Sequence, residues 1–313
     1  MKQHGTATVV KHTGSHYLLS ELPRWELIPA VIKGRVRLDA SQATNPVAVG
    51  DRVEYVIDWD EPDPMGTIER ILPRTNCIIR RSANLSRQSH VIAANLDRVF
   101  LVITVALPEI KPAFVDRFLI TCEAYQVHPV IVINKIDIYD EYQTAECRYW
   151  EDIYTRAGYQ VLTISALTGE GIDNIREMCR DKVSLFSGVS GVGKSSLISA
   201  LDPTLKVRTG EISISNKQGK HTTTFYEMHP LSGGGFLIDT PGIRGFGLVD
   251  IEPEELSTYF PEMLRVMDRC RFKPCTHTHE PGCAVKEAVD SGEISAERYN
   301  SYLGMLEEET KYR

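Results

Sequence analysis

The sequence lacks any hydrophobic run long enough to cross a membrane. Its longest apolar stretch, residues 99–107, contains a threonine and falls well short of the roughly 20 residues that a spanning helix needs. The N-terminus, MKQHGTATVV, also lacks the charged and apolar regions of a signal peptide. We therefore expect a cytoplasmic protein that has no membrane partner.

The cysteines are too few and too unevenly spaced for a disulfide framework. There are seven, so they cannot all pair. Three of them lie close together, at Cys270, Cys275 and Cys283, and the others are scattered. In a reducing compartment this pattern favours a metal site plus isolated buried thiols.

The chain also has no overall excess of positive charge. Its formal net charge is −7, which argues against a protein that simply coats nucleic acid. Basic residues nevertheless gather in residues 70–90, 206–220 and 265–273. Each such cluster is usually a solvated face, but three of them near functional motifs favour an RNA partner.

The first part of the chain has the pattern of a small β-barrel. At 313 residues, 42% hydrophobic and 25% charged, the protein is long enough for two or three soluble domains. Short runs of β-forming residues alternate with turns in residues 1–72, which predicts a closed barrel. These runs are residues 6–11, 17–20, 30–38, 51–59 and 66–72. We prefer a five-stranded oligonucleotide-binding (OB) barrel, with another small barrel as the alternative, and interpret residues 73–96 as a polar connector.

From residue 97 the pattern changes to alternating strands and helices. Apolar strands that alternate with helices predict a mostly parallel sheet covered on both faces. The expected strands are residues 99–105, 127–133, 160–164, 183–186, 223–228 and 235–238, and the expected helices are 113–125, 141–157, 172–180 and 194–201. After residue 250 the strands stop, and helices are expected at 254–260 and 296–310 on either side of the cysteine cluster.

Residues 188–195, GVSGVGKS, match the phosphate-binding pattern GxxxxGK[ST] between an expected strand and an expected helix. The glycines let backbone N–H groups turn toward a β-phosphate, and the helix N-terminus adds a partial positive charge. Lys194 is expected to bridge the β- and γ-phosphates, and the Ser195 hydroxyl to bind Mg²⁺. A chance match in a chain of this length is on the order of one in a hundred.

Two further motifs complete a guanine nucleotide site. Residues 239–242, DTPG, follow an apolar strand, so Asp239 suits the magnesium side and the Gly242 N–H the γ-phosphate. Residues 134–137, NKID, follow another strand. The Asp137 carboxylate can accept from guanine N1–H and the N2 amine, whereas adenine would leave it unpaired. Asn134 would brace this loop and the Lys135 stem would lie along the base.

The sequence Ser165-Ala166-Leu167 follows a third strand and is a plausible backbone contact to guanine O6.

The order of these motifs is unusual. Ordinary GTPases run from the P-loop to DTPG to NKxD, whereas here NKID and SAL precede the P-loop. A permuted sheet would place the same groups in the same site, because function depends on geometry and not on chain order.

A metal motif follows the sheet. Cys270, Cys275, His277 and Cys283 offer three thiolates and one imidazole, a set suited to tetrahedral structural zinc. His279 is the alternative fourth ligand. Because all four positions are filled by protein, no open position for a catalytic water is implied.

Taken together, the permuted order, the HTTT segment at 221–224, the preceding barrel and the trailing cysteine knuckle resemble the ribosome small-subunit-dependent GTPase A family. These are bacterial circularly permuted GTPases that assist late maturation of the 30S subunit. The resemblance spans nearly the whole chain. It implies a multidomain fold: an N-terminal OB-type, RNA-binding β-barrel at 1–72, a central α/β circularly permuted P-loop GTPase domain at 97–249, and a C-terminal α-helical zinc-binding domain at 250–313.

The resemblance also implies partners and contacts. The substrate would be GTP, hydrolysed to GDP and phosphate and stimulated by the small subunit, and the expected partners are the 30S subunit and its 16S rRNA, with a monomer off the ribosome. The Cys₃His spacing matches the zinc site of the family. The implied nucleotide contacts are Asn134, Lys135, Ile136, Asp137, Gly188, Val189, Ser190, Gly191, Val192, Gly193, Lys194, Ser195 and Ser196.

The residues that act in hydrolysis are less sharply indicated. A threonine of the HTTT segment (Thr222, Thr223 or Thr224) is expected to complete the Mg²⁺ shell when GTP binds. Many GTPases orient water with a glutamine just after DxxG, but Ile243 stands there. His221 is the best internal substitute, as the resemblance also suggests, and its alternative role is a loop contact to RNA.

Two other function classes compete with a GTPase that acts as an assembly switch. One is an ATP-using P-loop enzyme, against which NKID argues. The other is a non-catalytic RNA-binding module with a structural nucleotide, against which Lys194, Ser195 and Asp239 argue.

Overall fold

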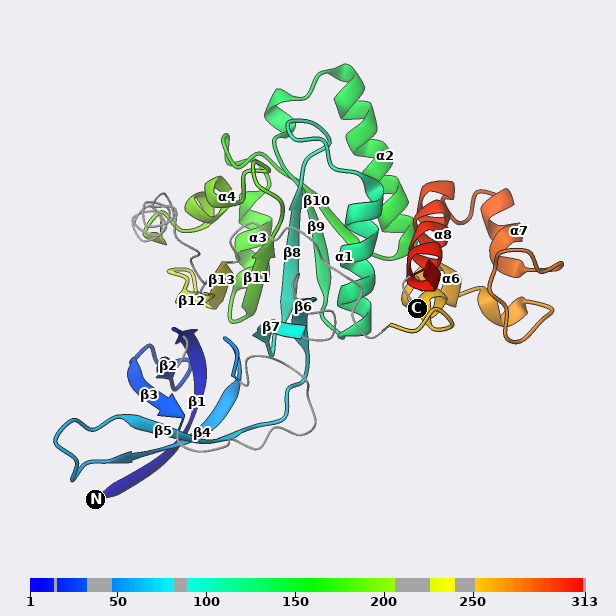
Figure 1. The fold of residues 1–313 in the computed structure, drawn as a ribbon. Coiled ribbons are helices and arrows are strands. Elements are labelled where there is room, and N and C mark those ends of the chain that lie inside the picture. The colour runs from blue at the N-terminus through cyan, green and yellow to red at the C-terminus, as the bar shows by residue number, and fades with distance from the viewer. Residues whose placement is uncertain (14–15, 33–46, 82–88, 206–225, 240–250, 312–313) are drawn as a thin grey trace.

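The structure is a computed structural model that describes all residues except 14–15, 33–46, 82–88, 206–225, 240–250 and 312–313. Figure 1 shows three parts: a small barrel at the N-terminus, a central sheet flanked by helices, and a helical part at the C-terminus. None of the helices that the described residues form has the length and apolarity needed to cross a bilayer.

The barrel closes because its first strand pairs with two others. The described residues form strands β1 (Lys2–His12), β2 (His16–Ser20), β3 (Ile28–Ile32), β4 (Arg52–Asp58) and β5 (Gly66–Ile71). Strand β1 pairs antiparallel with both β2 and β4, and β5 lies between β3 and β4. Alternate residues point inward, as the pleat of a strand requires, so that Val53, Tyr55 and Ile57 of β4 are buried while their neighbours are not.

The central sheet is the permuted α/β sheet that the sequence predicts. Its strands are β8 (Arg98–Ile103), β9 (Pro129–Ile133), β10 (Gln160–Thr163), β11 (Val183–Ser187), β12 (Glu227–Pro230) and β13 (Phe236–Asp239). Their order in space is β10-β9-β8-β11-β13-β12. All neighbours are parallel except the pair of β12 and β13. The carboxyl ends of the parallel strands therefore meet at one edge, where motif loops can converge.

Helices cover this sheet on both faces (Figure 1). They are α1 (Pro112–Ala124), α2 (Glu141–Ala157), α3 (Ile172–Cys179) and α4 (Lys194–Leu201). The bounds of α2 match the prediction because both ends carry strong local signals. Asp140 and Gln143 form a reciprocal capping box at its start, and Gly158 ends it with a φ of 113°.

Residues 73–96, interpreted from the sequence as a polar connector, contain regular structure instead. Strands β6 (Cys77–Arg81) and β7 (Ser89–Ala94) pair antiparallel as a separate two-stranded sheet. Its apolar residues Ile78 and Ile92 are fully buried in the central core. The burial of these side chains stabilises the hairpin, whose two short apolar runs are separated by a polar stretch in the sequence.

The C-terminal part has its own core. Its elements are η2 (Leu256–Tyr259), α6 (Pro261–Leu264), η3 (Met267–Arg269), α7 (Ala284–Asp290) and α8 (Ala296–Lys311). Phe260, Val285 and Tyr302 are buried together in this core, along with two of the clustered cysteines. Figure 1 places α8 beside α1, and these two helices make extensive contact.

Among the described residues, one cross-strand pair links the barrel to the central sheet. Lys11, near the end of β1, pairs with Glu227 at the start of β12, and their side chains form an ion pair of 2.9 Å. Since β12 is the outermost strand of the central sheet, β1 covers its edge and the two sheets become one continuous ladder.

Asp202, just after α4, fixes the turn between β12 and β13. Its carboxylate accepts hydrogen bonds from Thr204 and from the Ser232 N–H, the latter at 2.7 Å. Burial raises the pKa of Asp202, but these hydrogen bonds outweigh that effect and leave the pKa lowered. A carboxyl group with a lowered folded-state pKa contributes stability above the unfolded value of about 3.9 and loses it as the pH falls further.

We therefore expect Asp202→Asn to lower the free energy of unfolding at neutral pH and to flatten its decline below about pH 4. Denaturant unfolding at pH 7 and at successively lower pH checks this. Asp173→Asn, at an exposed carboxylate paired on the surface, is the matched control. If Asp202→Asn lowered the free energy of unfolding by the same amount at every pH, the assignment would be contradicted.

Candidate nucleotide and metal sites

The P-loop has the backbone that its glycines permit. Gly188, Gly191 and Gly193 have φ values of 157°, 91° and 89°. Gly188 also has no room for a side chain, because a Cβ there would lie 2.4 Å from the Val102 carbonyl oxygen of β8. The loop leads directly into α4, whose first residue is Lys194. Ser190, Gly191, Ser195 and Ser196 are exposed, so the inner face of the loop is open to a ligand.

Asn134 connects three of the predicted motifs. Its side chain is 1% exposed, donates to the Val192 carbonyl of the P-loop at 2.9 Å, and accepts from the Ala166 N–H at 3.0 Å. The fit is close: a Cβ on Gly193 would come within 2.4 Å of the Asn134 Nδ2. A buried amide with both ends satisfied fixes these loops relative to one another.

Asp137 and Lys135 belong to the same NKID motif as this buried amide. The Ser165 hydroxyl donates to Asp137 Oδ1 at 2.5 Å, and Asp137 is otherwise exposed. Lys135 has a left-handed backbone with φ of 71°, and its ammonium donates to the Leu107 carbonyl. The carboxylate thus keeps acceptor positions open toward solvent, where a base with two adjacent donors could bind.

Lys194 and Asp239 face each other across the phosphate end of the site. Their Nζ and Oδ1 atoms are 3.6 Å apart, and the side chains are 11% and 30% exposed. Within the described part of the chain, the buried Oδ1 of Asp239 has no hydrogen-bond partner. A carboxylate oxygen in this situation fits a hard divalent cation, either directly or through water.

Sequence reasoning missed Tyr139 and the loop of residues 104–111. The Tyr139 hydroxyl donates to the Asn134 carbonyl at 2.6 Å and accepts from the Val105 N–H at 3.1 Å. Burial raises the pKa of Tyr139 to about 12, so the hydroxyl keeps its proton at neutral pH. Pro108 of the same loop packs against the P-loop, since a Cβ on Gly191 would lie 3.5 Å from it. One feature of the sequence could have indicated this loop: it follows the carboxyl end of strand β8, the edge at which such sheets bind ligands.

The remaining predicted hydrolysis residues lie outside the described residues. These are His221, Thr222, Thr223, Thr224, Gly242 and Ile243. Their expected roles therefore stay predictions.

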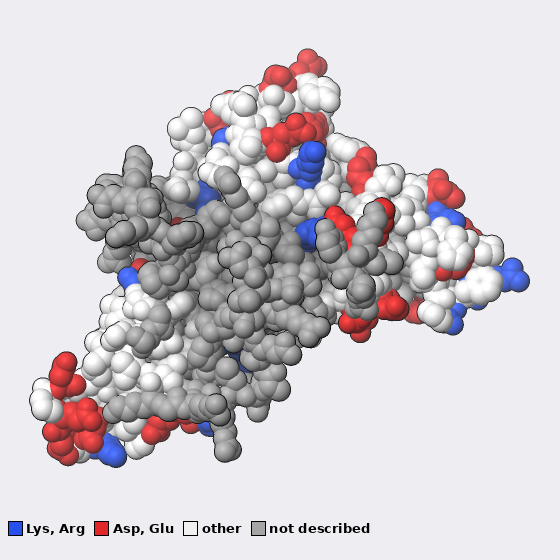
Figure 2. Space-filling model, viewed as in Figure 1, with Lys and Arg blue, Asp and Glu red and all other residues white. Residues whose placement is uncertain are grey.

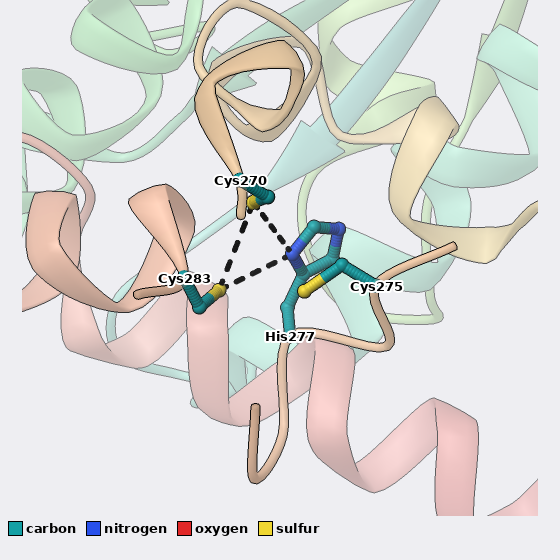
Figure 3. A group of neighbouring side chains, drawn as sticks. All are labelled: Cys270, Cys275, His277 and Cys283. Carbon is teal, nitrogen blue, oxygen red and sulfur yellow. Dashed lines mark hydrogen bonds between the residues drawn. The ribbon is translucent and has the colours of Figure 1, made fainter. Parts of the chain in front are cut away.

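The four predicted metal ligands meet at one point (Figure 3). The sulfur atoms of Cys270, Cys275 and Cys283 and a ring nitrogen of His277 all lie within 4.8 Å of one another. His277 Nδ1 is 3.7 Å from Cys270 Sγ and 3.4 Å from Cys283 Sγ, and the two sulfurs are 4.0 Å apart. Ligands at about 2.1–2.3 Å from a tetrahedral ion would have similar separations. The cluster can hold a metal ion.

Helix α8 supports the backbone of this cluster. Tyr299 donates to the His277 carbonyl at 2.6 Å, and Tyr302 donates to the neighbouring Thr276 carbonyl at 2.7 Å. His279, the alternative ligand, is not part of the cluster and instead contacts the Thr278 hydroxyl at 2.9 Å. The imidazole of His277 is thus the one placed for coordination.

Several residues of the basic clusters have structural partners. Arg74 forms a bidentate pair with the buried Asp51 at 2.7 Å, and Arg70 pairs with Glu54. Arg265 donates to the carbonyls of Ala157 and Arg156 at the end of α2. These residues are part of the fold, so their positive charge is a weaker argument for RNA than the sequence indicated.

Figure 2 shows no continuous basic patch among the described residues on the face drawn. Acidic side chains instead gather at the tip of the barrel, where the chain passes from β4 to β5. This loop contains Asp60, Glu61 and Asp63, and Asp58 is the last residue of β4. Its charge disfavours contact of this tip with a phosphate backbone.

Comparisons with known proteins agree with this geometry. Residues 71–249 match the model of the RsgA GTPase family. A small ribosomal subunit biogenesis GTPase of Bacteroides fragilis is 52% identical over 97% of this chain and 98% of its own length. One of Flavobacterium johnsoniae is 47% identical over 98% and 95%. The crystal structure of YjeQ from Thermotoga maritima is 37% identical with a TM-score of 0.81 over 99% and 100% of the two chains. YloQ, described as a circularly permuted GTPase, is 28% identical with a TM-score of 0.75 over 99% and 96%.

Proposed function

The chain belongs to the RsgA GTPase family, and from this premise we propose that it hydrolyses GTP and assists late maturation of the small ribosomal subunit. The curated relatives carry the name of small ribosomal subunit biogenesis GTPases. The structural observation that supports this most strongly is Asn134, which brings the P-loop, NKID and SAL segments together despite their rearranged order.

Asp137 reads the guanine base. Its carboxylate accepts from N1–H and the N2 amine, while the Ser165 hydroxyl holds the carboxylate in place. The Ala166 N–H already bonds to Asn134, so the SAL loop is pre-organised beside the base. The Lys135 stem lies along one face of the ring. Adenine offers no paired donors and would leave the carboxylate desolvated and unpaired.

The P-loop and its lysine bind the phosphates. Backbone N–H groups from Gly188 to Ser196 surround the β-phosphate, and the N-terminus of α4 adds favourable dipole charge. On binding, Lys194 exchanges its present partner Asp239 for the β- and γ-phosphates. Ser195, Asp239 and a threonine of the HTTT segment (Thr223 or Thr224) would hold Mg²⁺, which would supply positive charge against the β-phosphate of the leaving GDP.

Hydrolysis requires a polar group that orients the attacking water. Ile243 stands where many GTPases have a glutamine, and an aliphatic side chain cannot bond to water. We assign this role to His221. A histidine suits this role, because an imidazole in the HTTT segment can accept a proton or hold a water near neutral pH.

The Cys₃His cluster holds one structural zinc ion. Three thiolates and one imidazole nitrogen favour zinc over the oxygen-seeking cations. When bound, the ion cross-links residues 270–283. The ligands Cys270 and Cys283 are buried in the C-terminal core, so the site is integral to that core.

Removal of zinc is therefore expected to unfold α7 and loosen α8. Structural zinc contributes about 10 kcal/mol or more to the folding of small zinc peptides, and α7 begins directly after the ligand Cys283. Hydrogen exchange in α7 and α8 before and after chelation measures the effect. His277→Ala should release zinc and reproduce it, whereas His279→Ala should retain zinc. Unchanged exchange in α7 after complete metal removal would refute a structural role.

The partner is the 30S subunit, contacted through its 16S rRNA, and the protein is a cytoplasmic monomer when free. Because the tip between β4 and β5 is acidic, we infer that other surfaces of the barrel and the zinc-binding part face the RNA. Lys273 of this part is a basic side chain with 68% exposure.

Steady-state GTP hydrolysis titrated with purified 30S subunits tests the proposal. We expect slow turnover alone and strong stimulation that saturates with 30S, and no stimulation by 50S subunits. Competition between GTP and ATP in the same assay separates a GTPase from an ATP-using enzyme. Binding of GTP without turnover at saturating 30S would indicate the non-catalytic alternative.

A further inference from the structure

A fully buried arginine joins the C-terminal part to the central domain. Arg298 of α8 is 1% exposed. Its Nη1 lies 2.7 Å from Asp116 Oδ1 on α1, and its Nε and Nη2 lie 2.7 and 3.0 Å from the two oxygens of Glu262 on α6. Both carboxylates are at most 3% exposed. The guanidinium therefore connects one helix of the GTPase domain to two elements of the zinc-binding part.

Aromatic rings enclose this guanidinium. Its carbon lies 4.8 Å from the centre of the Phe260 ring, 5.4 Å from that of Tyr159 and 5.7 Å from that of Tyr154. Two of these rings belong to the central domain and one to the C-terminal part. Burial raises the pKa of Asp116, while the positive charge of Arg298 opposes that shift. The arginine is what allows two carboxylates to remain buried side by side.

A buried ionic cluster of this kind fixes orientation more tightly than apolar packing would. An apolar contact between α8 and α1 would tolerate sliding or rotation, because dispersion is non-directional. The planar guanidinium fork binds Glu262 with two parallel bonds and directs its remaining nitrogen at Asp116. Helix α1 can move relative to α8 only if this charged contact breaks inside the protein.

Helix α1 begins at the loop that borders the nucleotide site. Asp116 is in the second turn of α1, and residues 104–111 precede that helix. In this loop Leu107 accepts from the Lys135 ammonium, Pro108 packs on Gly191 of the P-loop, and the Thr104 hydroxyl bonds to the Pro108 carbonyl at 2.6 Å. Tyr139 links the Val105 N–H of the same loop to Asn134.

Helix α8 also contacts the metal cluster directly. Tyr299, next to Arg298 in sequence, binds the carbonyl of His277, and Tyr302 binds that of Thr276. A continuous series of contacts therefore runs from the metal cluster through α8, Arg298, Asp116 and α1 to the loop at residues 104–111.

We propose that Arg298 is a positioning residue for guanine nucleotide binding. Through Asp116 it sets the placement of α1 and of the loop at residues 104–111, and so couples the zinc-binding part to nucleotide affinity. This inference rests on the proposed function, because it assumes that the site binds guanine nucleotide. The coupling is reciprocal: nucleotide binding strengthens the contact between α8 and α1 by the same factor.

The test is the dissociation constant for GDP, measured by calorimetry on the full-length, zinc-loaded protein well below its melting temperature. Arg298→Met keeps the length of the side chain and removes its charge. We expect it to weaken GDP binding about five- to fiftyfold, in the range of typical coupling between sites. Arg298→Lys keeps the positive charge but loses the planar guanidinium, so it should weaken GDP binding less. It is the variant to measure if Arg298→Met does not fold.

Arg117→Met is the matched control. Arg117 is the next residue of α1 and pairs with Glu308 of the same helix α8, but at a partly exposed position. It should change GDP affinity less than twofold, because a solvent-exposed pair contributes little. Equal effects of Arg117→Met and Arg298→Met would show general loosening of the two helices and overturn the proposal.

A double-mutant cycle separates positioning from simple destabilisation. Tyr139→Phe removes the hydroxyl that links the loop to Asn134, far from Arg298. Effects of distant, uncoupled residues add, so strict additivity of Arg298→Met and Tyr139→Phe would overturn the proposal, whereas a smaller combined effect supports it. If Arg298→Met and Arg298→Lys both fold and bind GDP as tightly as wild type, the proposal is also overturned, but the proposed function still stands. Failure of the wild type to bind GDP would instead refute the proposed function.

Discussion

Replacement of Asp137 by asparagine is expected to abolish the preference for guanine. The carboxylate accepts from two donors of the base, and each hydrogen bond to a charged group contributes about 1.5–3 kcal/mol. Asparagine loses the bond to the N2 amine and only weakens the bond to N1–H, which together weaken GTP binding by about 10–10³-fold. The amide of asparagine can accept from N1–H and donate to a carbonyl at position 2, so xanthosine triphosphate should become the better ligand.

Competition binding with GTP, ATP and xanthosine triphosphate measures this change. Asp140→Asn is the control, since it removes the same charge three residues away and asparagine can still cap α2. It should leave the order of preference unchanged. If Asp137→Asn still prefers GTP to xanthosine triphosphate, another group reads the base.

Replacement of Lys194 by alanine is expected to have the second large effect, on the rate of hydrolysis. Its ammonium is mostly buried beside Asp239 and faces the place where charge builds up on the β- and γ-phosphates. Removal of one such pre-organised donor slows catalysis by about 10²–10³-fold. The remaining Asp239 would also lose its ion-pair partner, which disfavours phosphate binding further.

Single-turnover hydrolysis at saturating GTP and saturating 30S subunits isolates the chemical step. Lys182→Ala is the control, because Lys182 lies at the opposite end of β11 and pairs with Asp97 on the surface. A Lys194→Ala protein that hydrolyses GTP within a few-fold of wild type would remove Lys194 from the phosphate site.

Much of the architecture was predictable because its signals are local. The strand, loop and helix around residues 188–195 and the limits of α2 depend on glycines and caps that act within one turn. The metal ligands were recognisable for the same reason, since they all fall in one short segment. The permuted sheet followed from the order of motifs together with the alternation of strands and helices.

What the sequence could not predict depends on contacts between distant residues. Arg298 bonds to partners 36 and 182 residues away, and nothing near it in the sequence marks it as buried. The hairpin of β6 and β7 was missed because its buried apolar runs, residues 78–79 and 91–94, are short and a polar stretch separates them. Asn134 was expected to brace its own loop, but its bond to the P-loop carbonyl requires the fold to be known.

The order of strands in the central sheet has a consequence for how the chain assembles as it is synthesised. Strand β9 adds to β8, β10 adds to β9, β11 adds to the other side of β8, and the β12–β13 hairpin then adds to β11 through β13. Within the central sheet each of these strands adds to an open edge, and the β12–β13 hairpin fills the place between β11 and β1 of the barrel, which are both synthesised earlier. An ordinary GTPase order, which starts at the P-loop strand, would also build the sheet outward, from β11 alone. The rearranged chain can therefore extend its central sheet outward as it is synthesised, and the β12–β13 hairpin comes last, joining the sheet to the barrel through one unpaired edge on each side.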